Sequence, residues 1–99
     1  MAFDLHLKDA SEKIESQEEY FLVMASKQPQ LYPELSALWH HFHGSPKITP
    51  AVANTIVHEL IGLLSANKAD RALTKLIVRL LPLFSQAYLT QESIQCSSD

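Results

Sequence analysis

An amphipathic stretch from Ala69 to Leu89 constrains the fold of this chain more than any other part of the sequence. Its apolar residues recur at steps of three and four, which is the spacing of one face of an α-helix. Leu81 and Leu83 make that face broader than a single neighbouring helix would cover. The sequence therefore predicts a central helix that other elements surround. The predicted buried face consists of Leu73, Leu76, Ile77, Leu80, Phe84, Ala87 and Tyr88.

Pro82 lies inside this predicted helix, which we expect to begin near Lys68. A proline in a helix interior removes one backbone hydrogen bond and costs about 3 kcal/mol or more. The apolar periodicity nevertheless passes through it. We therefore predict a helix kinked at Pro82, and the alternative is a complete break followed by a fifth short helix.

Two segments between Leu31 and Asn67 carry clear helix boundaries. The first has Pro33 at its expected first position and a stop at Gly44. The second has Thr49 as a capping residue before Pro50, and it ends near Asn67. Both have one apolar face. The buried residues predicted for them are Leu31, Leu35, Leu38, Trp39 and Phe42, then Val52, Ile56, Leu60, Leu63 and Leu64.

The N-terminal region predicts a fourth helix and a flexible arm. Asp9 and Glu12 resemble a capping box, which places a helix at about residues 10–27. Residues 3–8 alternate between apolar and polar side chains, and we interpret residues 1–8 as a flexible N-terminal arm. The alternative is a short extended arm that pairs with a second chain.

These elements predict an all-α fold. We expect a single-domain antiparallel four-helix bundle over residues 9–90, with the last helix kinked or broken at Pro82. Residues 91–99 are polar without periodicity, so we predict a disordered C-terminal tail. We also expect the acidic edge of the first helix to face the basic edge of the last.

Composition argues against several classes of function and site. The net charge of −3 argues against non-specific binding to nucleic acid. Cys96 is the only cysteine, so neither an intramolecular disulfide nor a cysteine-based zinc site is expected. No signal peptide or membrane-spanning run is recognisable, and we expect a soluble cytoplasmic protein.

The histidine-rich segment around His40 and His43 is the first candidate for chemistry. These two residues are one helical turn apart, and His58 and Glu59 on the next helix would have to complete a metal site. Helical geometry turns the three histidines away from the apolar stripes that face each other. A polar surface is therefore the preferred interpretation, and a metal-binding protein is the alternative, with a site shared across a dimer interface as one form of it.

Catalysis finds no support in the sequence. No serine has a fixed spacing to a His–carboxylate pair, and Gly44 and Gly62 are isolated, so no phosphate-binding loop is present. We expect a non-enzymatic protein with no cofactor and no small-molecule substrate. A basic stripe on the last helix raises a further alternative, a nucleic-acid-associated regulator. Its residues are Lys68, Arg71, Lys75 and Arg79.

Protein–protein contact is the function that remains. Four apolar residues lie off the main stripes of helices that already bury a full face, and exposed apolar patches mark interfaces. We therefore predict a protein–protein interaction module that acts as a homodimer or against another protein. The candidate partner-binding residues are Val23, Ile61, Val78 and Leu89, together with Lys75 and Arg79 of the basic stripe.

Overall fold

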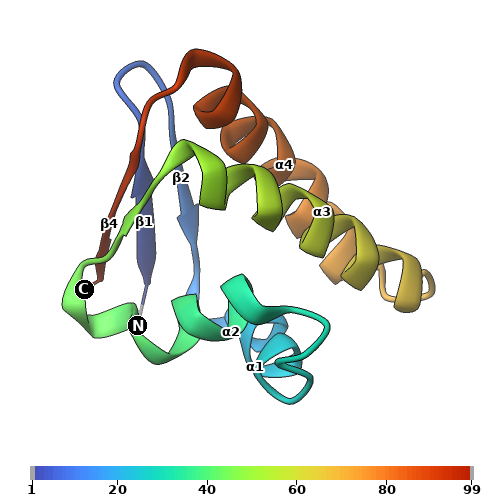
Figure 1. Cartoon of the computed structure of the whole chain (residues 1–99). Helices are drawn as coiled ribbons and strands as arrows, with labels where there is room; N and C mark the ends of the chain where they lie inside the picture. The colour runs from blue at the N-terminus through green and yellow to red at the C-terminus, as the bar shows by residue number, and fades with distance from the viewer. Residues whose placement is uncertain (1, 99) are drawn as a thin grey trace.

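The computed structural model describes residues 2–98, except for the side chain of Phe42. Within that range the chain forms four α-helices and a four-stranded sheet (Figure 1). The all-α prediction is therefore wrong. The strands are β1 (Phe3–His6), β2 (Ser11–Ile14), β3 (Lys47–Ile48) and β4 (Ile94–Ser98). The helices are α1 (Tyr20–Ser26), α2 (Pro33–His40), α3 (Pro50–Ala66) and α4 (Arg71–Thr90), with 3₁₀ turns η1 (Ser16–Glu18) and η2 (Phe42–Gly44).

The sheet has the strand order β2-β1-β4-β3, and each neighbouring pair is antiparallel. β1 lies in residues predicted as a flexible arm. Its period-two pattern is real, because Phe3 and Leu5 are buried while His6 is exposed. The partners of β1 are β2 and β4 of the same chain, which corrects both interpretations of this segment.

The β1–β2 hairpin replaces the first half of the helix predicted at residues 10–27. The Leu7 N–H donates to the Ala10 carbonyl oxygen at 2.7 Å, which closes a tight turn. Asp9 therefore belongs to a hairpin turn and not to a capping box with Glu12. α1 begins later than predicted but lies within the predicted segment, and it buries an apolar face.

β4 lies in the predicted disordered tail, so that prediction is also wrong. α4 ends at Thr90, and the residue that follows, Gln91, has a φ of 57° and turns the chain back along β1. Ile94 and Cys96 of β4 are buried against the core. This burial raises the pKa of the Cys96 thiol to about 12.

The three helices predicted after residue 30 are confirmed. Pro33 and Pro50 occupy the first positions of α2 and α3. The Thr49 side-chain oxygen accepts from the Val52 N–H at 3.4 Å, as expected of a cap. α4 begins three residues later than predicted, with Asp70 as its cap.

α4 runs through Pro82 without a break, so the alternative of a fifth short helix is wrong. Pro82 is exposed on the outer side of the helix. The kink stays a prediction. Since the ring faces outwards, the inner face keeps its full apolar stripe against the core.

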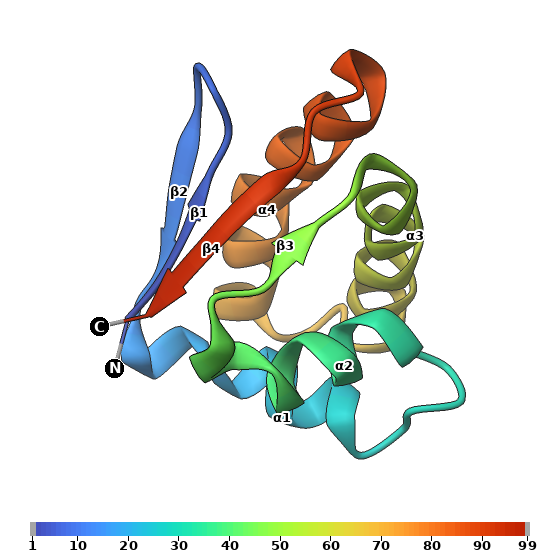
Figure 2. The ribbon, with the colours of Figure 1, turned by 60° about the vertical axis from the view of Figure 1, so that its left-hand side comes forward.

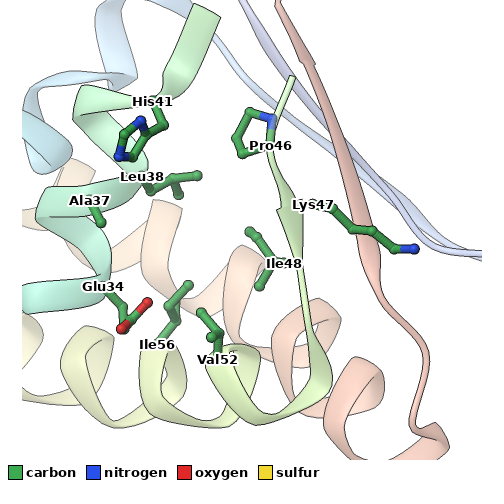
Figure 3. Close-up of a pocket in the computed structure, with 9 residues that line it drawn as sticks. All are labelled: Glu34, Ala37, Leu38, His41, Pro46, Lys47, Ile48, Val52 and Ile56. Atoms are coloured by element: carbon green, nitrogen blue, oxygen red, sulfur yellow. The ribbon is translucent and has the colours of Figure 1, made fainter. Parts of the chain in front are cut away.

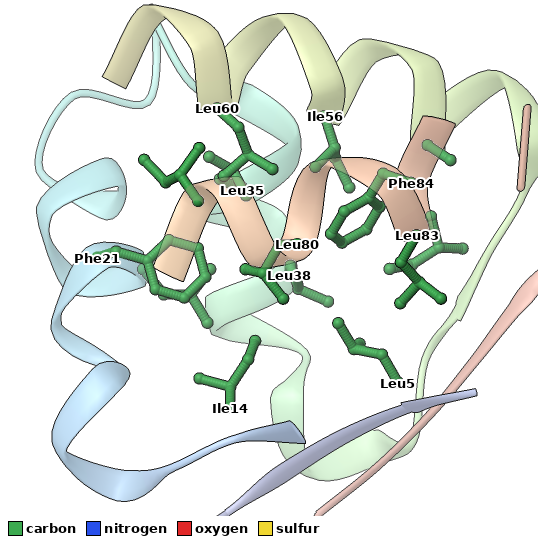
Figure 4. Packing of buried hydrophobic residues seen from close by; sticks show 14 of the residues in the cluster. Leu5, Ile14, Phe21, Leu35, Leu38, Ile56, Leu60, Leu80, Leu83 and Phe84 are labelled. Carbon is green, nitrogen blue, oxygen red and sulfur yellow. The ribbon is translucent and has the colours of Figure 1, made fainter. Parts of the chain in front are cut away.

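The sheet and the α3–α4 hairpin form two layers, and α1 and α2 close one end between them (Figure 2). Side chains from both layers meet in one core, with Leu5 and Ile14 facing Leu80 and Phe84 of α4 (Figure 4). Five predicted core residues are placed otherwise. Leu31 is 60% exposed and Tyr88 is 41% exposed, whereas Trp39, Val52 and Leu64 are only partly buried. The prediction for the Phe42 side chain lies outside the described part of the chain.

Candidate functional site

The outer side of α4 carries a stripe of residues whose two large apolar members are largely exposed. Val78, Pro82, Ser85 and Leu89 recur at steps of four, three and four, so they share one face of the helix. Val78 is 57% exposed and Leu89 is 75% exposed. We call these four residues the outer stripe of α4. Two of the predicted partner-binding residues belong to it.

The other two apolar candidates are placed differently. Ile61 is 48% exposed on α3, which packs along α4. Val23 is half-buried on α1, at the end of the molecule formed by α1 and α2. Ile61 therefore borders the α3–α4 hairpin surface, and Val23 belongs to another region.

The two basic candidates also differ from each other. Lys75 is exposed on the outer side of α4. Arg79 instead binds within the molecule. Its Nε donates to Glu12 Oε1 at 2.9 Å, its Nη1 and Nη2 both donate to the Glu18 carboxylate at 3.0 Å, and Nη2 also donates to the Lys13 carbonyl oxygen at 2.6 Å.

Arg79 thus ties α4 to the open edge of β2 and to η1. Its hydrogen bonds lower the pKa of Glu18, although partial burial opposes that effect. The expected meeting of an acidic and a basic edge occurs here, but Glu12 lies on a strand rather than on a helix. Arg79 therefore has a structural role in this fold, and its contact with a partner stays a prediction.

The histidines do not converge. His40 ends α2, His43 lies in η2 and His58 lies on α3, and all three are exposed. Among residues 2–98, no group of three or more His, Cys, Asp or Glu side chains is placed to hold a metal ion. The metal-binding alternative gains no support from the structure.

Sequence reasoning considered Glu59 only as a possible metal ligand and missed its role as a buried carboxylate. Glu59 of α3 is buried, and it accepts hydrogen bonds from the backbone N–H groups of Glu34 at 3.1 Å and Leu35 at 2.9 Å. These groups lie in the first turn of α2, where the capping residue Tyr32 supplies no side-chain bond. Glu59 therefore caps α2 from another helix.

Burial raises the pKa of Glu59, although the two backbone bonds act in the opposite direction. Its signal in the sequence is its position within the buried stripe of α3, between Ile56 and Leu63. A buried carboxylate at that position requires donors from a neighbouring element. Its two hydrogen bonds account for its position as a cap of α2.

A small cleft separates α2 from β3 (Figure 3). It has a volume of about 200 Å³, and Leu38, Ile48, Val52 and Ile56 supply much of its apolar wall. Figure 3 shows the Lys47 side chain pointing away from this space, so Lys47 contributes its main chain to the wall. No sequence pattern indicated this cleft, because its two sides come from elements that meet only in the fold.

α4 is long and apolar enough to cross a membrane by length and composition alone, a test that the core helix of a globular protein also passes. Its inner face is buried in the core that the sheet and α3 share. No known protein family, curated protein or solved structure matches the chain.

Proposed function

We propose that the protein is a non-enzymatic protein–protein interaction module that forms a homodimer through the outer stripe of α4. The observation that supports this most is the exposure of Val78 and Leu89 on one face of a helix whose other face is already buried. Large exposed side chains at helical spacing are typical of helix–helix interfaces.

The outer stripe is complementary to itself. If two copies of α4 pack antiparallel about an axis midway between residues 83 and 84, Val78 of one copy lies opposite Leu89 of the other. The same register places Pro82 opposite Ser85. The stripe spans about 16 Å at the usual rise of about 1.5 Å per residue. Two such stripes would bury each other's large side chains symmetrically.

Charge supports the antiparallel arrangement over a parallel one. Arg71 and Lys75 lie in the first turns of α4, where the helix dipole disfavours cations. In the antiparallel dimer they lie near the C-terminal end of the partner helix, whose free carbonyl groups attract them. This register also brings Lys75 towards the position of Glu92, just beyond the end of the partner helix.

Analytical ultracentrifugation between 5 µM and about 1 mM protein tests the proposal. We expect a concentration-dependent dimer for the natural protein and a monomer for Leu89→Glu, because a charge would be buried in the interface. Ala51→Glu places the same charge on an exposed position in the first turn of α3 and should leave the dimer intact. A natural protein that stays monomeric at 1 mM rules out self-association.

The register has its own test. We expect an equimolar mixture of Val78→Cys and Leu89→Cys proteins to form mainly the mixed disulfide on mild oxidation. Each variant alone should cross-link poorly, because position 78 lies about 16 Å from its own copy across the axis. The native Cys96 is buried and does not compete. Equal cross-linking of all pairs would exclude this register.

A further inference from the structure

The cleft between α2 and β3 lies beside an open sheet edge. β3 is the last strand in the order β2-β1-β4-β3, and β4 pairs with only one of its two sides. α2 stands across the cleft and does not extend the sheet. The free side of β3 therefore faces the cleft, where main-chain groups and an apolar cavity lie together.

The strand register identifies which main-chain groups face the cleft. The Cys96 N–H donates to the Pro46 carbonyl oxygen at 3.0 Å, and Lys47 is paired with Gln95 at the next position. In an antiparallel ladder, hydrogen-bonded pairs alternate with non-hydrogen-bonded pairs. The N–H and C=O of Lys47 consequently point away from β4 and towards the cleft.

Side chains on the edge strand alternate as a pleat requires. Ile48 is buried towards the cavity, while the Lys47 side chain is exposed on the outer face of the sheet. A strand added beside β3 would follow the same pleat. Its residue opposite Lys47 would point outwards, and its residue opposite Ile48 would point into the cavity.

The cavity fits one side chain better than a free ligand. Pockets for drug-sized molecules measure about 300–1,000 Å³, whereas this cavity measures about 200 Å³. Leu38, Val52 and Ile56 around it favour an aliphatic group. The outward position beside Lys47 favours an acidic group, because opposite charges on neighbouring strands attract and the other neighbour, Gln95, is uncharged.

We propose that this cleft binds an extended peptide segment of a partner protein as a fifth, antiparallel strand beside β3. An aliphatic residue of the peptide enters the cavity, and the acidic residue that follows it pairs with Lys47. The acidic residue exchanges two main-chain hydrogen bonds with Lys47, in the manner of strand addition to an exposed sheet edge. The outer stripe of α4 does not line this site, so the inference is independent of the proposed dimer.

Titration with an acetylated, amidated Gly-Thr-Leu-Glu-Thr-Gly peptide tests the site by NMR. We expect the backbone amide signals of Ala37, Lys47, Ile48 and Val52 to shift, and the Lys47 amide to become protected from hydrogen exchange. The same peptide with an N-methylated glutamate keeps every side chain but loses the donor to the Lys47 carbonyl. It should bind several-fold more weakly, and equal binding of both peptides overturns the proposal.

Two substitutions test the cavity and the charge separately. Ala37 lines the cavity from α2, and Ala37→Leu fills it with a good helix former. We expect binding to weaken about tenfold or more, since an aliphatic side chain can no longer be buried. The matched control Ala66→Leu, on an exposed position of α3, should have no effect.

Lys47→Glu should weaken binding of the Leu-Glu peptide about threefold and strengthen binding of a Leu-Lys peptide by a similar factor. Leu89→Glu should change neither affinity. No amide shift at 5 mM peptide, unchanged binding by Ala37→Leu, or shifts confined to other parts of the chain would each refute a strand-addition site at β3.

Discussion

The α3–α4 hairpin and the sheet are two halves of one core that differ in how far apart their partners lie in the sequence. α3 and α4 are consecutive helices joined by a short connection. The central strands β1 and β4 pair Phe3 with Ser98, across almost the whole chain. A helix of 20 residues repeats its apolar period several times within itself, but a strand of four residues does so only twice. How clearly an element can be predicted from the sequence therefore does not measure how much that element stabilises the fold.

The largest expected loss of stability tests that statement directly. Phe3 in β1 and Leu80 in α4 both have no exposed surface. We expect Phe3→Ala to lower the free energy of unfolding by about 3–5 kcal/mol, and Leu80→Ala by about 2–5 kcal/mol. Urea denaturation followed by circular dichroism measures both. A loss below about 1 kcal/mol for Phe3→Ala would show that β1 is the flexible arm that its length suggested.

A smaller effect concerns the joint between the hairpin and α2. Glu59→Ala leaves one buried and one partly buried N–H group of α2 without their acceptor, so we expect a loss of about 1–3 kcal/mol. Glu59→Gln keeps one acceptor and should cost less. Equal losses for the two variants would argue that packing, and not the cap, is what Glu59 provides.

The same residue predicts a dependence on pH. The pKa of Glu59 is raised above its ordinary 4.5 in the folded state, so the folded protein binds the proton more tightly than the unfolded chain does. The contribution of this group to stability therefore falls as the pH rises above 4.5. Relative to Glu59→Gln, the natural protein should lose stability over that range, as measured by thermal unfolding at a series of pH values. An opposite slope would contradict the raised pKa.

The joint between the hairpin and the sheet edge should contribute less. Arg79→Ala removes an exposed but multiply bonded guanidinium, and we expect a loss of about 1 kcal/mol that shrinks at high salt. Arg79→Lys should not restore it, because an ammonium cannot bind the Glu18 carboxylate with two nitrogens. Since the pKa of Glu18 is lowered, this contribution is present above pH 4.5 and is lost as the pH falls further.

Arg71→Ala, on the outer side of the same helix, is the control for Arg79→Ala and should leave the stability within about 0.5 kcal/mol. If both arginine variants lose equally, the effect comes from the helix and not from its tie to β2.

The smallest effect is expected where the apolar pattern was misleading. Leu31 fits the stripe of α2 by spacing, but it precedes the helix and is 60% exposed. Leu31→Ala should change the free energy of unfolding by less than about 0.5 kcal/mol. Leu35→Ala, at a buried position of α2, should cost about 2–5 kcal/mol. Comparable losses would place Leu31 in the core after all.

Sequence reasoning located α2, α3 and α4 because residues close in the sequence mark the boundaries of these helices. Thr49 and Pro50 begin a helix whatever surrounds them. It missed β4 because Cys96 stands among polar neighbours, and pairing with β1 and β3 is what makes that segment a strand. Pairing of this kind depends on residues far away in the chain, which no local pattern contains.

The candidate surfaces also differ in whether a local sequence pattern indicates them. The exposure of Val78 and Leu89 follows from helical spacing alone, whereas their role in binding stays a prediction. Arg79 has the spacing of a surface cation, and its use as a tie to β2 depends on where the hairpin turn places Glu12. The cleft depends on the edge of β3 meeting α2, so it could not be inferred before the fold was known.

Because Phe3 lies opposite Ser98 in the sheet, the two ends of the described chain are neighbours, and the sequence order of the elements could be permuted. Antiparallel neighbours lie about 5 Å apart, so a short linker would join residues 2 and 98, and new ends could be opened between α3 and α4. In such a circular permutant β4, β1 and β2 become a continuous meander, and contacts that now span the whole molecule become local. Chains rich in local contacts fold faster. The permutation also makes the α3–α4 contacts, which are local in the natural order, the most distant ones. The permutant should therefore reach the same architecture with the meander formed early and the α3–α4 packing formed late.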